Sequence, residues 1–269
     1  MALAAALAAG TPSLVAATRG YSAAPFQPGE VLHYKVKWGI FRLGTMELVQ
    51  EPPDSSGNAR CAISLSGQSA RGMPFVHFHT VDRALLDPHD PRNWVFSTES
   101  AGDSGGRTFY RSDSSADEMS IVEVEGERVV RAERLPHTGP LYDALGLLML
   151  IRGMSGSGEE IEAQMVVGRK VSSTRLRFTD EVKEVKSEAF PEPVRVRRFD
   201  GQGEWTCKSC AGMTGHFEGW VTDDSSAVPV EVSLKIAVGS VVVKLESCSR
   251  SCRPAGPASA DPAVVHAGN

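Results

Sequence analysis

The sequence predicts a mainly β protein, built as a curved antiparallel sheet or an open barrel-like meander around one buried apolar helix. Three observations support this fold class: runs of alternating apolar and polar residues, short polar corners between the runs, and a single long apolar segment. In the first run, from Glu30 to Trp38, the side chains of Leu32, Tyr34, Val36 and Trp38 fall on one face. A period of two is typical of a half-buried strand, so this face is expected to point toward the core.

Similar runs recur along the rest of the chain. They are Thr45–Gln50, Cys61–Leu65, Asn93–Thr98, Arg107–Arg111, Ser120–Glu125, Arg128–Arg134, Ile161–Val167, Val171–Phe178, Val182–Glu188, Val194–Phe199, His216–Val221, Val230–Ile236 and Ser240–Glu246. Many are separated by short polar corners, such as Gly168-Arg169-Lys170 and Thr179-Asp180-Glu181. Corners of this length predict hairpins, and therefore a meander of antiparallel strands.

The exception to this pattern is the segment TGPLYDALGLLMLIRGM, residues 138–154. Thr138 or Gly139 can cap a helix, Pro140 suits the first helical position, and Gly153 can end it. Apolar residues cover most of the circumference of this helix, which predicts burial on nearly all sides. The helix is too short to cross a bilayer, so we expect it inside the curved sheet or closing one end of it.

Composition narrows the class of protein and its location. The chain has 269 residues and a net charge of −5, so its overall composition carries no basic footprint for nucleic acid or for anionic lipid headgroups. Residues 1–24 begin with an uncharged, Ala-rich stretch that predicts a signal peptide or a disordered leader. Residues 25–252 are expected to form a single β-rich domain and residues 253–269 a disordered tail. With no transmembrane segment predicted, we expect a soluble periplasmic or secreted protein.

The stretch Gly102-Asp103-Ser104-Gly105-Gly106 resembles the nucleophile signature of chymotrypsin-like serine proteases. Too little chain precedes Ser104 for such a fold, and the strand-like RTFYR follows it where a hydrolase elbow needs a helix. We therefore interpret the stretch as a turn between two strands. A serine hydrolase that uses Ser104 remains the alternative.

Four cysteines form two close pairs, Cys207 with Cys210 and Cys248 with Cys252. Four thiolates could bind a structural zinc ion, but an oxidising compartment favours disulfides, with Cys61 left as a free thiol. Whether these four cysteines form disulfides or bind zinc stays open at this level. Either arrangement would suit a stapled protein-interaction module, the second alternative for the function.

Two further polar pairs are candidates for chemistry. His77 and His79 project to the same face of a predicted strand and could share a metal, but no third ligand accompanies them. Asp223 and Asp224 lie at a turn, where aspartates usually accept hydrogen bonds from their own backbone. Both pairs are interpreted as structural, and no residue is assigned as catalytic, cofactor-binding or metal-binding.

Three blocks of the sequence together resemble a bacterial envelope family, domain of unknown function 3108. The blocks are residues 26–48, 139–154 and 219–247, and they span most of the predicted domain. The matching positions are Gly29, Glu30, Leu32, Tyr34, Gly44, Leu48, Asp143, Arg152, Trp220, Asp223, Asp224, Pro229, Val230, Gly239, Ser240 and Val241. The resemblance implies a periplasmic, predominantly β protein without an established activity, and it supplies no catalytic residue.

These observations predict a non-catalytic envelope protein without a cofactor. The helix has more apolar surface than one contact face can cover, so an apolar or lipid-like ligand is a candidate partner. In the simpler alternative, the sheet alone buries the helix.

Overall fold

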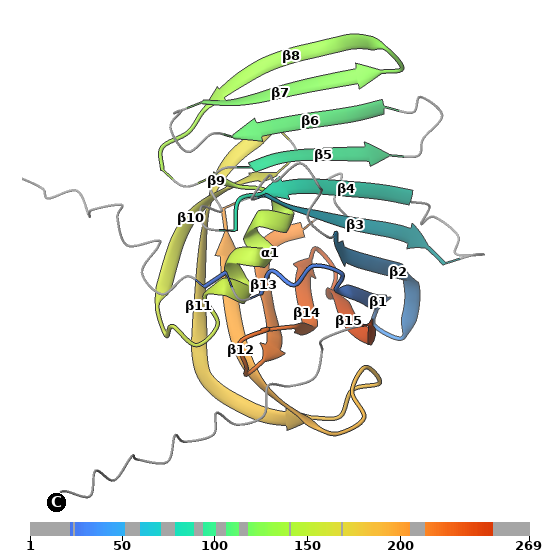
Figure 1. Cartoon of the computed structure of the whole chain (residues 1–269), viewed down its shortest axis with the longest axis vertical. Coiled ribbons are helices and arrows are strands. Elements are labelled where there is room, and N and C mark those ends of the chain that lie inside the picture. Colours follow the sequence, from blue (N-terminus) through green and yellow to red (C-terminus); the bar gives the residue numbers. More distant parts are fainter. Residues whose placement is uncertain are drawn as a thin grey trace, which may run out of the picture.

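A computed structural model describes residues 22–23, 25–51, 60–70, 79–88, 94–100, 106–112, 118–139, 141–167, 169–204 and 213–249. Within these ranges the chain forms one helix and a single sheet of 15 strands (Figure 1). The strands are β1 Val31–Trp38, β2 Phe41–Gln50, β3 Cys61–Ser69, β4 His79–Leu86, β5 Trp94–Ser100, β6 Gly106–Ser112, β7 Glu118–Glu125, β8 Arg128–Pro136, β9 Leu141–Tyr142, β10 Glu160–Val167, β11 Lys170–Val185, β12 Val194–Gly203, β13 Met213–Thr222, β14 Pro229–Ile236 and β15 Ser240–Ser249. The helix is α1, Ala144–Gly153.

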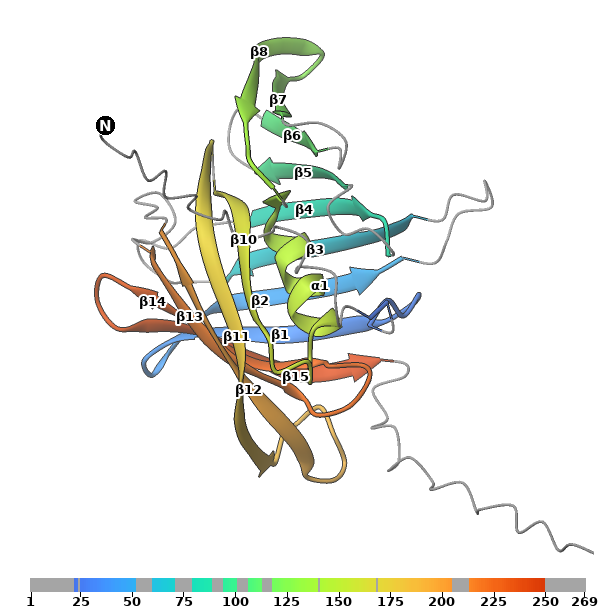
Figure 2. The same ribbon diagram turned by 90° about the vertical axis from the view of Figure 1, so that its left-hand side faces the viewer.

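The strand order shows that the chain is a meander in two halves. Strands β1 to β8 run in sequence from the middle of the sheet to one edge. The chain then crosses through β9 and α1 to the opposite edge, and β10 to β15 return to the middle, where β15 pairs with β1. Every pairing is antiparallel except that of β9 with β10. The sheet is strongly curved and unclosed, which confirms the predicted fold class (Figure 2).

The alternation of the sequence determines which face of each strand is buried. In β1, Leu32, Tyr34 and Val36 are buried, whereas the polar residues between them are half-buried. The same parity continues into the neighbouring strands, because Leu48 of β2 lies opposite Leu32 and Ile63 of β3 is also buried. These side chains belong to one apolar cluster, which also includes Leu145 and Met149 of α1.

The helix begins later than the sequence suggested. Its N-cap is Asp143, whose carboxylate Oδ1 accepts a hydrogen bond from the Gly146 N–H, so the prediction of Thr138 or Gly139 as the cap was wrong. Leu141 and Tyr142 precede the cap as strand β9, because they pair with Gln164 and Met165 of β10. Pro140 lies outside the described residues. The predicted end is confirmed, since Gly153 is the last helical residue.

Two strand predictions also need correction. The polar corner Thr179-Asp180-Glu181 does not end a strand; it lies inside β11, where the pairing with β12 shifts register between Phe178 and Val182. Because β12 pairs with β11 on both sides of this bulge, the backbone ladder continues past it. Strand β4 was predicted only at its start, because His79 was placed on a strand with His77, whereas the full run HTVDRALL alternates only weakly.

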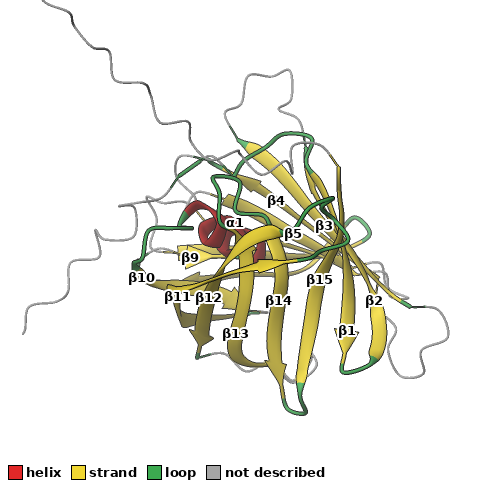
Figure 3. Ribbon diagram, turned by 90° about the horizontal axis from the view of Figure 1, so that it is seen from below, coloured by secondary structure: helices red, strands yellow, loops and turns green. Residues whose placement is uncertain are grey.

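Helix α1 lies on the concave side of the sheet (Figure 3). Eight of its ten residues are buried, as its composition predicted, and it packs against β4 from one half of the sheet and β9 and β10 from the other. Within the described residues, no helix has the length and apolar character needed to cross a membrane.

Candidate functional site

A buried ion pair ties the C-terminal end of α1 to the start of the sheet. Arg152, in the last turn of the helix, donates from Nη1 to Glu30 Oε2 at 2.7 Å and from Nη2 to Glu30 Oε1 at 2.9 Å. Both side chains are fully buried. A two-pronged arginine–carboxylate pair has a defined geometry as well as favourable energy, so this contact fixes the position of the helix against β1.

The remaining donors and acceptors of this ion pair are also satisfied. Arg152 Nη2 donates to the carbonyl oxygen of Ser226 at 2.9 Å, and Gln50 Nε2 donates to Glu30 Oε2 at 2.6 Å. Gln50 Nε2 also donates to the Pro25 carbonyl oxygen at 3.0 Å. We call Glu30, Gln50, Arg152 and the Ser226 carbonyl the helix-end cluster. A buried charge pair is tolerated only where such additional hydrogen bonds exist.

The turn that carries Ser226 is built by Asp224. Its Oδ1 accepts hydrogen bonds from the backbone N–H groups of Ser226 and Ala227, both at 3.0 Å, and from the Ser226 hydroxyl at 2.6 Å. Ala227 has a positive φ of 43°, a conformation that L residues rarely adopt and that this network supports. The turn role predicted for Asp224 is thereby confirmed. Asp223 has a different contact, since it accepts from Arg195 and Arg197 at 2.8 Å.

The structure brings together residues from the three sequence blocks 26–48, 139–154 and 219–247, which are far apart along the chain. Glu30 and Tyr34 come from the first block, Arg152 from the second, and Asp224 and Pro229 from the third. The Tyr34 hydroxyl donates to the Pro229 carbonyl oxygen at 3.2 Å, beside the helix-end cluster. Glu30 and Arg152, two of the positions that carry the resemblance, therefore connect the helix to the sheet.

The opposite end of α1 contains a second buried carboxyl group. Asp143 is fully buried, and its Oδ2 has no hydrogen-bond partner. Burial raises the pKa of Asp143 to about 7, although the hydrogen bond from the Gly146 N–H opposes the shift. The adjacent residues Tyr142 and Leu145 are also buried, so the surroundings of Asp143 disfavour the charged form of its carboxyl group.

The two halves of the sheet are joined by the β1–β15 pairing at its middle, and they meet again at a seam where side chains make the contacts. Arg169, at the β10–β11 turn, forms ion pairs with Glu133 of β8 at 2.9 Å and with Glu123 of β7 at 3.4 Å. Farther along the seam, Gln164 of β10 accepts a hydrogen bond from the Thr138 N–H and donates one to the Thr138 hydroxyl. The buried Trp94 of β5 donates from Nε1 to the Leu141 carbonyl oxygen at 2.7 Å. These contacts form the boundary between the N-terminal and C-terminal halves.

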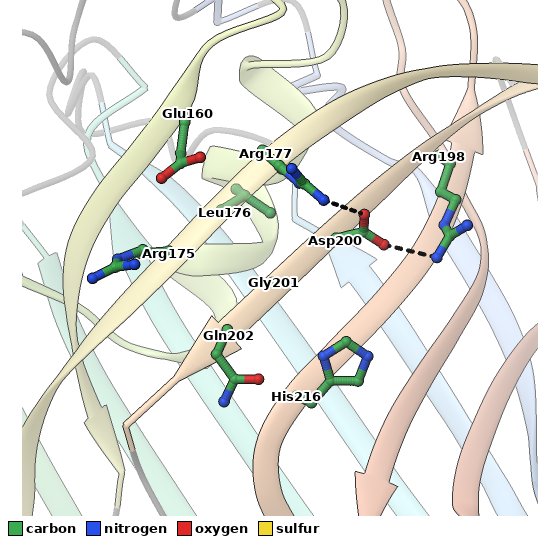
Figure 4. Close-up of a pocket in the computed structure, with 9 residues that line it drawn as sticks. All are labelled: Glu160, Arg175, Leu176, Arg177, Arg198, Asp200, Gly201, Gln202 and His216. Carbon is green, nitrogen blue, oxygen red and sulfur yellow. Dashed lines mark ion pairs between the residues drawn. The ribbon is translucent and has the colours of Figure 1, made fainter.

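Two polar grooves lie on the sheet surface. The larger, about 350 Å³, crosses β10 to β13 and is lined by exposed polar side chains that include Arg175 and His216 (Figure 4). Within it, Asp200 is paired with Arg177 at 3.6 Å and with Arg198 at 3.0 Å. The second groove, about 320 Å³, lies over β1 to β4. In the first groove the acidic and basic groups largely pair with each other, so the arrangement does not single out one ligand chemistry.

The structure places the other sequence candidates apart from these clusters. Ser104 lies outside the described residues, but β5 and β6 on either side of it are antiparallel partners, with Glu99 opposite Arg107, as the turn interpretation requires. His77 also lies outside them, whereas His79 is an exposed residue of β4 that lines the second groove.

The cysteine prediction is tested only in part. Cys207, Cys210 and Cys252 lie outside the described residues, and Cys248 lies near the end of β15. The choice between disulfides and zinc therefore stays a prediction. Cys61 is a free thiol, and burial raises its pKa. The described part of the chain contains no cluster of three or more potential metal ligands.

Sequence reasoning missed the seam residues and the partners of the helix-end cluster. Arg169 was noted only as part of a polar corner, and Gln50 only as the end of a strand. The one local signal was the position of Arg152 at the end of an apolar run, which suggests a buried charge that needs a partner but does not say which residue supplies it.

Comparison with known proteins supports the fold. No protein-family model and no curated protein matches the chain. Among solved structures, it is similar to a beta-barrel-like protein of domain of unknown function DUF1849 from Brucella abortus, with a TM-score of 0.55 and 11% identity over 82% of this chain and 96% of that one. The class that fold and site define is thus a barrel-like protein with an internal helix. The resemblance to domain of unknown function 3108 remains a resemblance.

Two further structures align with lower scores. One is described as an exported protein with a YmcC-like fold from Bacteroides fragilis, at a TM-score of 0.35 and 10% identity over 84% of this chain and 98% of that one. The other is described as a lipoprotein from Parabacteroides distasonis. It aligns at a TM-score of 0.32 and 8% identity over 84% of this chain and 97% of that one. None of the three names describes an enzymatic activity.

Proposed function

We propose that this chain is a non-catalytic envelope protein that binds an apolar or lipid-like ligand between the two halves of its sheet. The observation that carries the proposal is the seam: β8 and β9 are the edges of an unclosed sheet, and the Arg169 ion pairs join the two sides. Directly inside lies α1, which packs against β4 on one side of the seam and against β10 on the other.

The ion pairs that join the two sides of the seam are weaker than the backbone ladders that join the other strands. Arg169, Glu123 and Glu133 are each between about a quarter and a third exposed, and ion pairs that water reaches contribute only about 0–1 kcal/mol. Elsewhere, adjacent strands are joined by continuous backbone hydrogen bonds. Tyr110, a residue of the core cluster, lies near Arg169, Glu123 and Glu133, so opening the seam would expose its ring.

The envelope location is supported by the uncharged, Ala-rich leader and by the resemblance noted from the sequence. The non-catalytic role is supported by the helix-end cluster. Its two charged side chains, Arg152 and Glu30, hydrogen-bond to each other, and Arg152 also donates to the Ser226 carbonyl oxygen. A buried pair of this kind has a positioning role for the helix and presents no free nucleophile or base.

The test is native mass spectrometry on the full chain recovered from the periplasm of an expression host, compared with the denatured chain. We expect an extra mass that matches a lipid and disappears on denaturation. A bare native mass, together with no fluorescence gain from the apolar probe N-phenyl-1-naphthylamine, would overturn the proposal. An extra mass matching zinc would instead support the cysteine module.

Seam variants then locate the ligand. Arg169→Ala with Glu133→Ala should release bound lipid to acceptor vesicles faster than the wild type. The matched control is Arg128→Ala, which removes an exposed ion pair with Glu125 in the β7–β8 hairpin and should leave release unchanged. Equal release rates for the seam variant and the control would place the ligand elsewhere.

A further inference from the structure

The tips of two neighbouring hairpins carry exposed apolar side chains. In the β1–β2 hairpin, Trp38 is 39% exposed, Ile40 88% and Phe41 54%, and in the β14–β15 hairpin Val238 is 69% exposed. The two turns lie side by side, because β1 pairs with β15 and Trp38 is opposite Val241 (Figure 3). We call Trp38, Ile40, Phe41 and Val238 the apolar tip. Four exposed apolar side chains at the same end of the sheet indicate a surface that interacts with another molecule.

The apolar tip has a defined shape. Trp38 Nε1 donates a hydrogen bond to the Val238 carbonyl oxygen at 2.8 Å, which joins the two turns. The rings of Trp38 and Phe41 lie 6.4 Å apart between centroids, within the range of aromatic contact. Gly39, with φ of 55°, and Gly239, with φ of 81°, permit both turns to be tight. Ile40 and Val238 therefore project from a platform that the hydrogen bond holds together.

The two hairpin ends that form the apolar tip carry basic residues, some of which are paired with glutamates from outside these segments. Residues 35–46 and 232–245, which form the two hairpin ends, contain five basic residues and no Asp or Glu, in a chain whose net charge is −5. The five are Lys35, Lys37, Arg42, Lys235 and Lys244. Lys35, Arg42 and Lys244 form ion pairs with Glu188, Glu246 and Glu231 from outside these segments. Lys37 and Lys235 have no ion pair within the described part of the chain and flank the tip.

We propose that the apolar tip docks this protein on the surface of a lipid bilayer that carries anionic headgroups. Aromatic and aliphatic side chains with adjacent Lys and Arg residues are the combination that anchors proteins at membrane interfaces. The two unpaired lysines complement a negative headgroup layer. Four side chains offer too little area for a stable protein–protein interface, which needs about 800 Å² per partner, whereas shallow insertion into a bilayer has no such requirement.

The docking surface is distinct from the seam, and the proposal does not depend on a bound ligand. The seam involves β7, β8 and β10, at the far edges of the sheet, whereas the apolar tip lies at its middle. The two proposals can therefore fail independently. A chain without a bound lipid can still dock, and a chain with one can fail to dock.

The experiment is flotation of the full chain with vesicles of phosphatidylethanolamine and phosphatidylglycerol, compared with vesicles of phosphatidylcholine. The wild type should float with the anionic vesicles, and less so at high salt. Ile40→Ser with Phe41→Ser should lower the partition coefficient at least about tenfold, because two inserted apolar side chains are lost. Lys37→Gln with Lys235→Gln should lower it about threefold to tenfold on anionic vesicles only.

The matched control is Val129→Ser with Val130→Ser, an aliphatic pair on β8 that is 58% and 40% exposed but lies at the edge of the sheet (Figure 1). This control should bind like the wild type. The proposal is overturned if the wild type stays unbound to both kinds of vesicle, or if the tip variant and the control bind equally. It is also overturned if the tip substitutions convert a dimer into a monomer without changing flotation, since the apolar tip would then contact a second copy of the chain.

Discussion

Replacing Asp143 with Asn should make the protein more stable at neutral pH, by an amount that grows as the pH rises. The folded state raises the pKa of Asp143 from 3.8 to about 7 because the carboxyl group is completely buried. The folded state therefore holds the proton more tightly than the unfolded state. A raised pKa contributes stability that is complete below pH 3.8 and is lost as the pH rises toward the folded pKa of about 7.

The magnitude follows from the difference between the two pKa values. Each pH unit in this interval costs about 1.4 kcal/mol, so the wild type loses roughly 4 kcal/mol between low and neutral pH because of this group. The Asp143→Asn variant would keep the cap, since an amide oxygen also accepts from the Gly146 N–H. The substitution removes the titrating proton and therefore the pH-dependent loss.

The assay is urea unfolding of the wild type and Asp143→Asn, followed by circular dichroism at several values between about pH 5 and about pH 8. The difference in free energy of unfolding should increase by about 1.4 kcal/mol per pH unit up to about pH 7 and then level off. Other titrating groups cancel because both chains contain them. A difference that stays constant with pH would refute the reasoning, because Asp143 would then be ionised in the folded state like an exposed carboxyl.

Three further substitutions test the packing. Glu30→Gln should destabilise the fold by about 3–5 kcal/mol, because it leaves Arg152 buried without a counter-charge, whereas Glu99→Gln at an exposed ion pair should cost less than about 1 kcal/mol. Similar costs would show that the helix-end cluster is not a buried charge pair. Gly201→Ala should cost about 1–3 kcal/mol, since a Cβ there would overlap the Phe217 ring. Gly106→Ala, whose Cβ would meet the Val124 carbonyl oxygen at an ordinary contact distance of 4.0 Å, should be nearly neutral, and unfolding in urea distinguishes the two variants. Tyr34→Phe should cost about 1 kcal/mol through the lost hydrogen bond to Pro229, and no change in midpoint would argue that this contact is absent in solution.

Most of the strands were predictable because their physical cause is local. Alternation in residues such as Leu32, Tyr34 and Val36 requires one buried face whatever the neighbouring strands are. The apolar character of α1 likewise predicted burial on nearly all sides. The boundaries were less predictable: Leu141 and Tyr142 could have continued the helix, and only pairing with β10 makes them a strand.

The candidate site was much less accessible from sequence. Glu30 and Arg152 are 122 residues apart, and nothing local indicates that they share a pair of hydrogen bonds. The bulge at residues 179–181 depended in the same way on a partner, because β12 continues past it. The apolar tip combines Trp38 with Val238, which only the pairing of β1 with β15 brings together.

The sequence by itself determined the class of structure: an antiparallel β protein with one internal helix, because periodicity and apolar content act on each segment alone. The tertiary structure decided which distant residues meet. It brings Arg169 into an ion pair with Glu133 across the seam and Arg152 into an ion pair with Glu30. It also brings the β1–β2 and β14–β15 hairpin ends next to each other, because β1 pairs with β15. The physical reason is that side-chain periodicity is a property of the local backbone, whereas ion pairs and surface patches depend on the order in which strands pair.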